Sequence, residues 1–230
     1  MKILALETST DSGSVALLDG SSLTERQVPG SPGHSETLLP AVISLLHDCG
    51  VPLAGLDAIA FGAGPGAFTG LRLACGVAQG LAIGLGKPLI PVGTLEALAS
   101  QCPEEAIFAA VDARMSEVYF AAYRRVQDGL VEILPPACAV PGSVILPPSG
   151  VWFGFGTAFR AYQEVLVSGL GPRLGGFDGA PVPRASSIAS LAAPRLVRGE
   201  TLDPALAAPL YVRDKVAMTT VERLARGGKA

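Results

Sequence analysis

The 230-residue chain has few charged and few aromatic residues. Charged side chains make up 16% of it and aromatic ones 6%, against 49% apolar residues, and the net charge is −3. A chain this apolar can form a sizeable core but leaves little charged surface, which favours buried contact with a partner. A net negative charge does not by itself attract nucleic acid.

Metal-binding and redox motifs are also missing. The cysteines are Cys49, Cys75, Cys102 and Cys138. None of them forms a Cys-x-x-Cys pair, so neither a zinc ribbon nor a thioredoxin-like site is expected. Three of them have apolar neighbours in the sequence, which is typical of buried thiols in a reducing compartment. The only histidines, His34 and His47, are too far apart for a metal-binding pair on one helix. Because His34 precedes Ser35 and Glu36, we expect it to contribute to helix capping and first-turn polarity.

Long hydrophobic segments are absent as well. The N-terminus reaches Glu7 after a short apolar run, so it lacks the apolar core of a signal peptide. The most apolar window, 73–85, is shorter than the roughly 20 residues that a helix needs to cross a bilayer. We therefore expect a soluble cytoplasmic protein that makes no membrane contact.

The chain is organised around a glycine-rich stretch at residues 61–72. A short buried strand is predicted at 57–61 and a helix at 71–85, so this stretch is either an anion-binding turn or a tight turn that brings the helix close to a sheet. Gly62, Gly64 and Ala67 match G-x-G-x-x-A, but no acid follows about 20 residues later to hold a ribose. A Walker A loop fails too, so a dinucleotide fold and a P-loop are both unexpected.

Two helices carry more apolar surface than one core face needs. The helix predicted at 35–49 has two adjacent apolar stripes, and the one at 71–85 has glycines at every fourth position, which allow another helix to approach closely. Because the second helix is apolar all round, we expect it to be buried all round, against the first helix or against another protein. The expected interface residues are Leu38, Val42, Leu45, Leu71, Arg72, Gly76, Ala78 and Gly80.

The second half of the chain repeats the plan of the first. Strands are predicted at 2–6, 14–18 and 23–28, and again at 106–111, 117–123 and 130–134. We place a domain boundary between a lobe of residues 1–101 and a lobe of residues 102–230, whose last helix packs back on the first lobe. Thr94 is predicted to cap a short helix. The remaining segments are a strand at 151–155, helices at 158–167, 188–197 and 219–229, and a loop-rich region at 168–185.

An acid lies at the end of the first strand of each half. Glu7 could hold a magnesium-bound water while the hydroxyls after it meet phosphate, and Asp112 takes the same place in the second half; turn capping is the alternative. The candidate nucleotide-binding residues are Glu7, Thr8, Ser9, Thr10, Gly64, Gly66 and Asp112. No residue is assigned as catalytic or as a metal ligand.

Three motifs together resemble one protein family. The segments 3–10, 64–72 and 111–119 are similar to the dimerisation subunit of the bacterial tRNA threonylcarbamoyladenosine synthesis complex, TsaB or YeaZ, and 209–213 resembles its C-terminal signature. The resemblance implies an α/β fold with two related lobes, as in actin, heat-shock proteins and sugar kinases (ASKHA, ribonuclease H-like). Where this chain has Glu7, many members of the family have Asp.

The resemblance further implies a non-catalytic role. The chain would pair through a helix bundle with a larger metal-containing paralogue of the TsaD type, which transfers threonylcarbamoyl to adenosine in tRNA, and a small TsaE-type ATPase would join them. A second copy of this chain is the alternative partner for the same helices. ATP or ADP with Mg²⁺ would bind weakly or at a site shared with a partner. The alternative is an independent ATPase or a glycoprotease-like peptidase.

Overall fold

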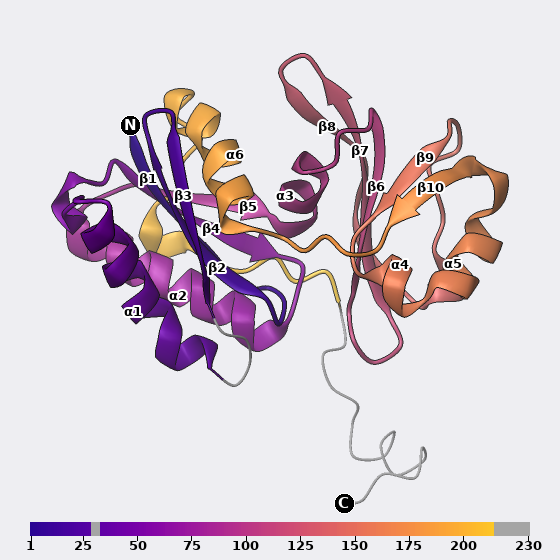
Figure 1. Ribbon diagram of the computed structural model, residues 1–230, viewed down its shortest axis with the longest axis horizontal. Coiled ribbons are helices and arrows are strands. Elements are labelled where there is room, and N and C mark those ends of the chain that lie inside the picture. Colours follow the sequence, from indigo (N-terminus) through magenta and orange to yellow (C-terminus); the bar gives the residue numbers. More distant parts are fainter. Residues whose placement is uncertain (29–32, 214–230) are drawn as a thin grey trace, which may run out of the picture.

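Two five-stranded sheets form the framework of the computed structural model, which describes residues 1–28 and 33–213 (Figure 1). The first sheet has the order β3-β2-β1-β4-β5 and the second the order β8-β7-β6-β9-β10. In each sheet the first three strands are antiparallel and the last two run parallel to the first. The two lobes therefore have the same topology, which confirms the duplicated α/β fold.

The strands of the first sheet are β1 (Lys2–Glu7), β2 (Gly13–Asp19), β3 (Ser22–Val28), β4 (Ala58–Gly64) and β5 (Leu89–Gly93). Those of the second are β6 (Ala106–Asp112), β7 (Val118–Val126), β8 (Gly129–Ala139), β9 (Trp152–Phe155) and β10 (Leu174–Asp178). Short 3₁₀ turns lie at Leu53–Gly55, Pro141–Ser143, Gly171–Arg173 and Pro204–Leu206.

Helices cover both faces of the first sheet. Successive side chains of a strand point to opposite faces, so Leu4 and Leu6 of β1 face one layer while Ile3 and Ala5 face the other. The first layer consists of α1 (His34–Asp48) and α2 (Phe68–Leu85), and the second of α6 (Ala185–Val197). Burial on both faces explains why β1 and β4 are apolar along their length.

The second sheet is also covered on both faces. The short helices α4 (Ala158–Ala161) and α5 (Gln163–Leu170) pack over a cluster that contains Phe108, Phe120 and Trp152. On the other face, α3 (Thr94–Ser100) buries Leu95 and Leu98 between the lobes. Apolar packing on α3 therefore joins the two lobes.

Several segments differ from the sequence prediction. Strand β4 continues through Gly62 to Gly64 and α2 begins at Phe68, so the true turn is only three residues long. The expected loop at 168–185 contains β10, and the helix expected at 158–167 breaks at Tyr162. Thr94 is the first residue of α3 rather than its cap, and its buried hydroxyl has no partner. Cys75 and Cys102 are buried whereas Cys49 and Cys138 are half-buried.

Two expectations about the C-terminal half remain predictions. The helix expected at 219–229 lies outside the described residues. The boundary at 101/102 is also untested, although α6 lies on the first sheet and α3 packs against the second.

Helix α2 is not buried all round within this chain, so burial of its outer side against another protein stays a prediction. Its Ala74 and Ala78 pack on the sheet, but Gly76, Gly80 and Ile83 are exposed. Because glycine has no side chain, the row of glycines leaves this face of α2 uncovered and exposed to solvent. Among the described helices, α2 with its 18 residues is the one whose length and composition would allow it to cross a membrane; 33% of it is buried within this chain.

Candidate functional site

A cleft of about 210 Å³ lies between the lobes, where β1 ends and α2 begins. On the opposite wall are the β6–β7 hairpin and α4. The lining side chains are mostly polar and include Ser9, Thr10, Asp11, Ser12, Asp112, Arg114, Thr157 and Arg160.

The glycines of the turn make room for the end of β1. A Cβ atom on Gly62 would lie 2.0 Å from Glu7 Oε2, one on Gly66 2.5 Å from Ser9 Cβ, and one on Gly70 1.8 Å from Thr8 O. These glycines are spaced four residues apart, and each packs against a different residue at the end of β1. Two hydrogen bonds fix this contact, from Ala67 N–H to Ser9 O (2.7 Å) and from Thr8 Oγ1 to Gly70 O (2.7 Å). These glycines therefore serve close backbone packing.

The carboxyl group of Glu7 is fully buried and points to Gly62, away from the cleft. Its Oε1 accepts a hydrogen bond from Ser9 N–H (2.5 Å), and its Oε2 has no partner. Burial raises the pKa of Glu7, and the hydrogen bond from Ser9 N–H offsets this only in part. In this position Glu7 cannot hold a magnesium-bound water for a ligand in the cleft.

The remaining candidate nucleotide-binding residues divide into two groups. Thr8 is fully buried, and Gly64 lies beneath the backbone of Leu210, so neither faces a ligand. The others, Ser9, Thr10, Gly66 and Asp112, do line the cleft. The hydroxyl of Ser9 is buried without a hydrogen-bond partner.

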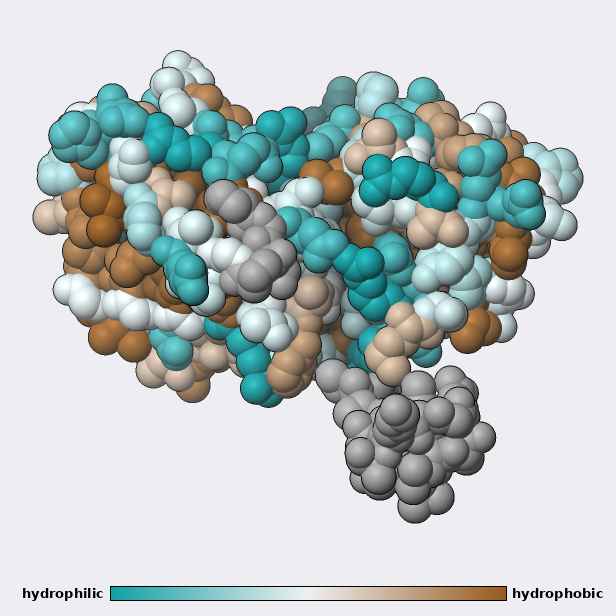
Figure 2. Space-filling model, turned by 60° about the horizontal axis from the view of Figure 1, so that its bottom comes forward, coloured by the Kyte–Doolittle hydropathy of each residue, from teal (hydrophilic) through white to brown (hydrophobic). Residues whose placement is uncertain are grey.

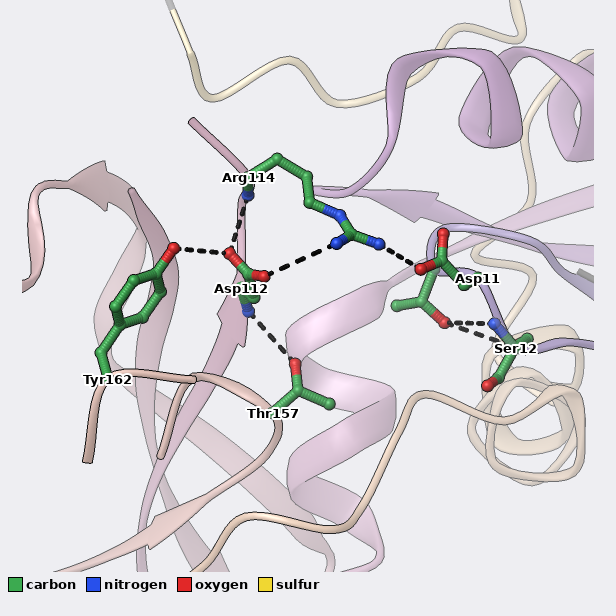
Figure 3. Close-up of polar contacts among 7 residues, drawn as sticks. Asp11, Ser12, Asp112, Arg114, Thr157 and Tyr162 are labelled. Carbon is green, nitrogen blue, oxygen red and sulfur yellow. Dashed lines mark hydrogen bonds and ion pairs between the residues drawn. The ribbon is translucent and has the colours of Figure 1, made fainter. Parts of the chain in front are cut away.

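Polar contacts within the protein surround Asp112 (Figure 3). Its Oδ1 accepts hydrogen bonds from Arg114 N–H (2.9 Å) and from the hydroxyl of Tyr162 (3.0 Å), and its own N–H donates to Thr157 Oγ1 (3.1 Å). Burial, and then the hydrogen bond to Asp112, raise the pKa of Tyr162. The Arg114 guanidinium lies 4.0 Å from Asp112 Oδ2 and also forms an ion pair with Asp11 of the first lobe.

Sequence reasoning missed the partners of Asp112. The motif Asp112-Ala113-Arg114 was visible, but nothing marked Asp11 as the residue that Arg114 would meet across the cleft. Thr157 and Tyr162 lie in a segment without a recognisable pattern, and only the packing of α4 beside β6 brings them to the site.

The β6–β7 hairpin has an unusual backbone. Arg114, Met115 and Ser116 all have positive φ, at 60°, 54° and 60°. In this left-handed region a residue with a Cβ costs about 1–2 kcal/mol. The hairpin is closed by hydrogen bonds from Ala113 N–H to Glu117 O (2.9 Å) and from Glu117 N–H to Arg114 O (3.0 Å).

The segment 207–213 runs from the first lobe to this hairpin (Figure 1). At one end Leu210 N–H donates to Ala63 O (2.7 Å), and Arg72 Nε donates to the hydroxyl of Tyr211 (3.0 Å). At the other end Arg213 Nη2 donates to Ala113 O (2.9 Å) and lies 2.6 Å from Glu117 Oε2. The signature 209–213 therefore has a structural role, because it ties α2 to the second lobe.

His34 does not cap α1 as expected. The N-cap residue is Gly33, without a side-chain hydrogen bond, and the Thr37 hydroxyl donates to Gly33 O (2.6 Å). The His34 ring is buried against Gly13, where a Cβ would lie 2.7 Å from Nε2. Burial lowers the pKa of His34, with Asp11 opposing the shift.

The expected helix interface needs correction. Burial in this chain's own core excludes contact with a partner for Leu38, Val42, Leu45, Leu71 and Ala78. Of the expected set, Arg72, Gly76 and Gly80 are exposed. On α1 the outward residues belong to the apolar stripe beside Leu38, Val42 and Leu45, with Leu39 44% and Ile43 56% exposed. On α2 Ile83 is 59% exposed.

These outward residues form an open apolar face, which we call the α1–α2 face: Leu39, Ile43, Gly76, Gly80, Ile83 and Gly84. Figure 2 shows hydrophobic residues gathered over this side of the first lobe. A Cβ atom added at any of the three glycines would meet nothing within 4 Å. The face therefore has room for the backbone of another helix.

The described residues contain no cluster of three or more His, Cys, Asp or Glu side chains that could hold a metal ion. The cleft offers hydroxyls and two arginines, and the acids that line it are engaged by Arg114.

Comparisons with known proteins agree on one family. A family model described as "TsaD: tRNA N6-adenosine threonylcarbamoyltransferase" matches residues 29–171. The chain is 34% identical to the tRNA threonylcarbamoyladenosine biosynthesis protein TsaB of Escherichia coli, over 94% of this chain and 96% of that protein. It is also 34% identical to TsaB of Haemophilus influenzae, with 94% and 95% covered. The solved structure of YeaZ from Pseudomonas aeruginosa superposes with a TM-score of 0.84 at 39% identity, covering 91% of this chain and 99% of that one.

Proposed function

Because the chain belongs to the TsaB (YeaZ) family of tRNA threonylcarbamoyladenosine biosynthesis proteins, we propose that it is the non-catalytic partner subunit of the complex that transfers threonylcarbamoyl to adenosine in tRNA. It binds and supports a metal-containing catalytic paralogue of the TsaD type. The observation that carries this proposal is the open α1–α2 face.

The composition of this face favours a helical partner. Leu39, Ile43 and Ile83 provide apolar area, which is worth roughly 25 cal/mol for each Å² buried. The outward glycines of α2, Gly76, Gly80 and Gly84, cost about 1 kcal/mol each relative to alanine in a helix, and nothing in the chain's own packing offsets this. Close packing of a partner helix on this row of glycines would offset that free-energy cost.

The paralogue fits this surface by symmetry. The match of residues 29–171 to the TsaD family model spans α1 and α2, so a related enzyme has counterparts of both helices. Two related helix pairs that meet on the same face form a four-helix bundle around a pseudo-two-fold axis. A second copy of this chain can use the same face, so homodimer and heterodimer would compete for it.

The rest of the complex follows from the family. A small ATPase of the TsaE type joins the pair, tRNA is bound through the complex rather than by this chain alone, and the assembly works in the cytoplasm. In this complex the chain would act as a scaffold for the catalytic subunit.

The alternative, an independent ATPase or peptidase, has less support. Glu7 faces Gly62 rather than the cleft, and Asp112 is held by Arg114 and Tyr162. A nucleotide would therefore meet the hydroxyl of Thr10 without a free carboxylate for magnesium. We expect the isolated chain to hydrolyse neither ATP nor peptides, and turnover that Asp112→Asn abolishes would contradict the proposal.

The interface is tested with two matched substitutions. Ile43→Glu places a charge on the α1–α2 face, whereas Ile145→Glu places the same charge at an isoleucine that is 64% exposed on the second lobe. We expect Ile43→Glu to prevent co-purification with the TsaD-type paralogue and to abolish tRNA modification in a reconstituted assay. Ile145→Glu should leave both unchanged.

The two variants also separate interface from stability. Both side chains are exposed, so both variants should keep the wild-type melting temperature. A complex that forms normally with Ile43→Glu would show that the paralogue binds elsewhere.

A further inference from the structure

Arg114 connects the two lobes across the cleft. Its backbone N–H bonds to Asp112 in its own lobe (2.9 Å), while its guanidinium pairs with Asp11 at the tip of the first lobe (Figure 3). The side chains of Arg114 and Asp11 are 67% and 68% exposed, so water competes for both charges and the pair is weak. A weak contact across a cleft can open and close readily.

The position of Arg114 depends on the left-handed hairpin. Three consecutive residues with positive φ are unfavourable without support from elsewhere. That support comes from Arg213, whose guanidinium binds Ala113 O (2.9 Å) and Glu117 Oε2 (2.6 Å) on the two sides of the loop. The Arg213 side chain is only 14% exposed, so this contact is better shielded than the Arg114 pair.

Arg213 in turn is carried by the segment 207–213. The other end of this segment is attached to the first lobe, through Leu210 on Ala63 and Tyr211 on Arg72. One short segment thus touches both the first turns of α2 and the hairpin that aims Arg114.

We infer that Arg114 is a latch that holds the two lobes closed over the cleft, and that Arg213 sets this latch by fixing the hairpin. When the Arg114–Asp11 pair breaks, the lobes separate about their apolar junction at α3 and the cleft opens. A movement of the segment 207–213 releases Arg213 from the hairpin and favours the open form. The latch operates in the isolated chain and needs no partner.

The test measures the distance between the lobes by pulsed electron paramagnetic resonance on the full chain. Spin labels are attached at Ser22→Cys on the first lobe and Asp128→Cys on the second, both exposed. Cys49 and Cys138 are replaced by alanine, while the buried Cys75 and Cys102 stay. Asp11→Asn and Arg114→Asn each remove one half of the latch, and asparagine tolerates the left-handed backbone at position 114.

Each single variant should raise the population with changed interlobe distance by up to about fivefold, as expected for an exposed ion pair. The double variant should raise it no further, because both changes remove the same contact. Arg213→Met keeps an unbranched side chain but removes the guanidinium that lies over Tyr119 and binds the hairpin, and should open the cleft as well. Arg198→Met removes an exposed pair with Glu200 that does not bridge the lobes, and should change nothing.

Wild-type distance distributions in both Asp11→Asn and Arg114→Asn would overturn the latch. If those two variants open the cleft but a folded Arg213→Met does not, the role of Arg213 is wrong. Asp11 lies in an exposed turn, so its variant tests the latch even if Arg213→Met fails to fold.

Discussion

The same substitution should have opposite effects at two glycines of helix α2. Gly70 and Gly80 both have helical backbones, but their surroundings differ. A Cβ at position 70 would lie 1.8 Å from the backbone oxygen of Thr8, whereas a Cβ at position 80 would meet nothing within 4 Å. Alanine is the better helix former by about 1 kcal/mol, so the surroundings decide the sign.

The magnitude for Gly70→Ala follows from three contributions. A backbone oxygen cannot swing aside as a side chain can, so the start of α2 must move away from β1, and such overpacking costs about 1–3 kcal/mol. The movement also weakens the buried bond from Thr8 Oγ1 to Gly70 O, at about 1–3 kcal/mol. After the gain in helix propensity, we expect a loss of about 3 kcal/mol, or roughly 6–12 °C in melting temperature for a chain of this size.

Gly80→Ala should instead stabilise the isolated chain by up to about 1 kcal/mol. Thermal unfolding and urea denaturation, followed by circular dichroism, measure both variants against the wild type. A Gly70→Ala variant as stable as the wild type would refute the close contact between the glycine stretch and the end of β1. A destabilised Gly80→Ala variant would show that this row of glycines is packed within the chain.

Two further predictions concern charged groups. Burial raises the pKa of Glu7 in the folded state, so the folded chain binds the proton more tightly than the unfolded chain does. The free energy of unfolding should therefore fall as pH rises from about 4.5 through the folded-state pKa. The slope is at most about 1.4 kcal/mol per pH unit. Glu7→Gln should flatten this dependence in urea titrations between pH 4.5 and 8, and an unchanged slope would show that another group causes it. Arg195 of α6 binds both carboxylate oxygens of Glu96 in α3 (2.6 and 2.7 Å), with both side chains largely shielded, so Arg195→Met should cost about 2–3 kcal/mol. The matched change Arg198→Met removes a fully exposed pair and should leave the midpoint of urea unfolding unchanged; equal losses in the two variants would contradict the role of burial.

Much of the fold was visible in the sequence because local patterns specify it. The alternation and apolar runs of the first 28 residues predict the β1–β3 meander, and its repetition after residue 105 predicts the second lobe. β10 was missed because Leu174–Asp178 contains two glycines and lacks a strand pattern. It pairs with β9 only because that edge of the second sheet is available.

The site was predictable only in part. The acid at the end of β6 and the hydroxyl-rich segment at the end of β1 do lie at one cleft, as their places at equivalent strand ends suggested. The direction of each side chain could not be inferred: Glu7 turns to Gly62, and Asp112 is held by Tyr162 and Arg114. The same limit applied to the helices, where composition predicted an apolar surplus but not which stripe faces outward.

The sequence by itself therefore determined the duplicated architecture, the family and the presence of two helices with more apolar surface than one core needs. The apolar surplus and the repeated strand pattern follow from periodicity, which is local, whereas the family and its two-lobe fold came from the resemblance of the motifs at 3–10, 64–72 and 111–119. Only the tertiary structure decided that the glycines at positions 62, 66 and 70 receive the end of β1 while those at 76, 80 and 84 face outward. The physical reason is that a glycine's role depends on which atoms lie where its side chain would be, and those atoms come from strands far away in the sequence.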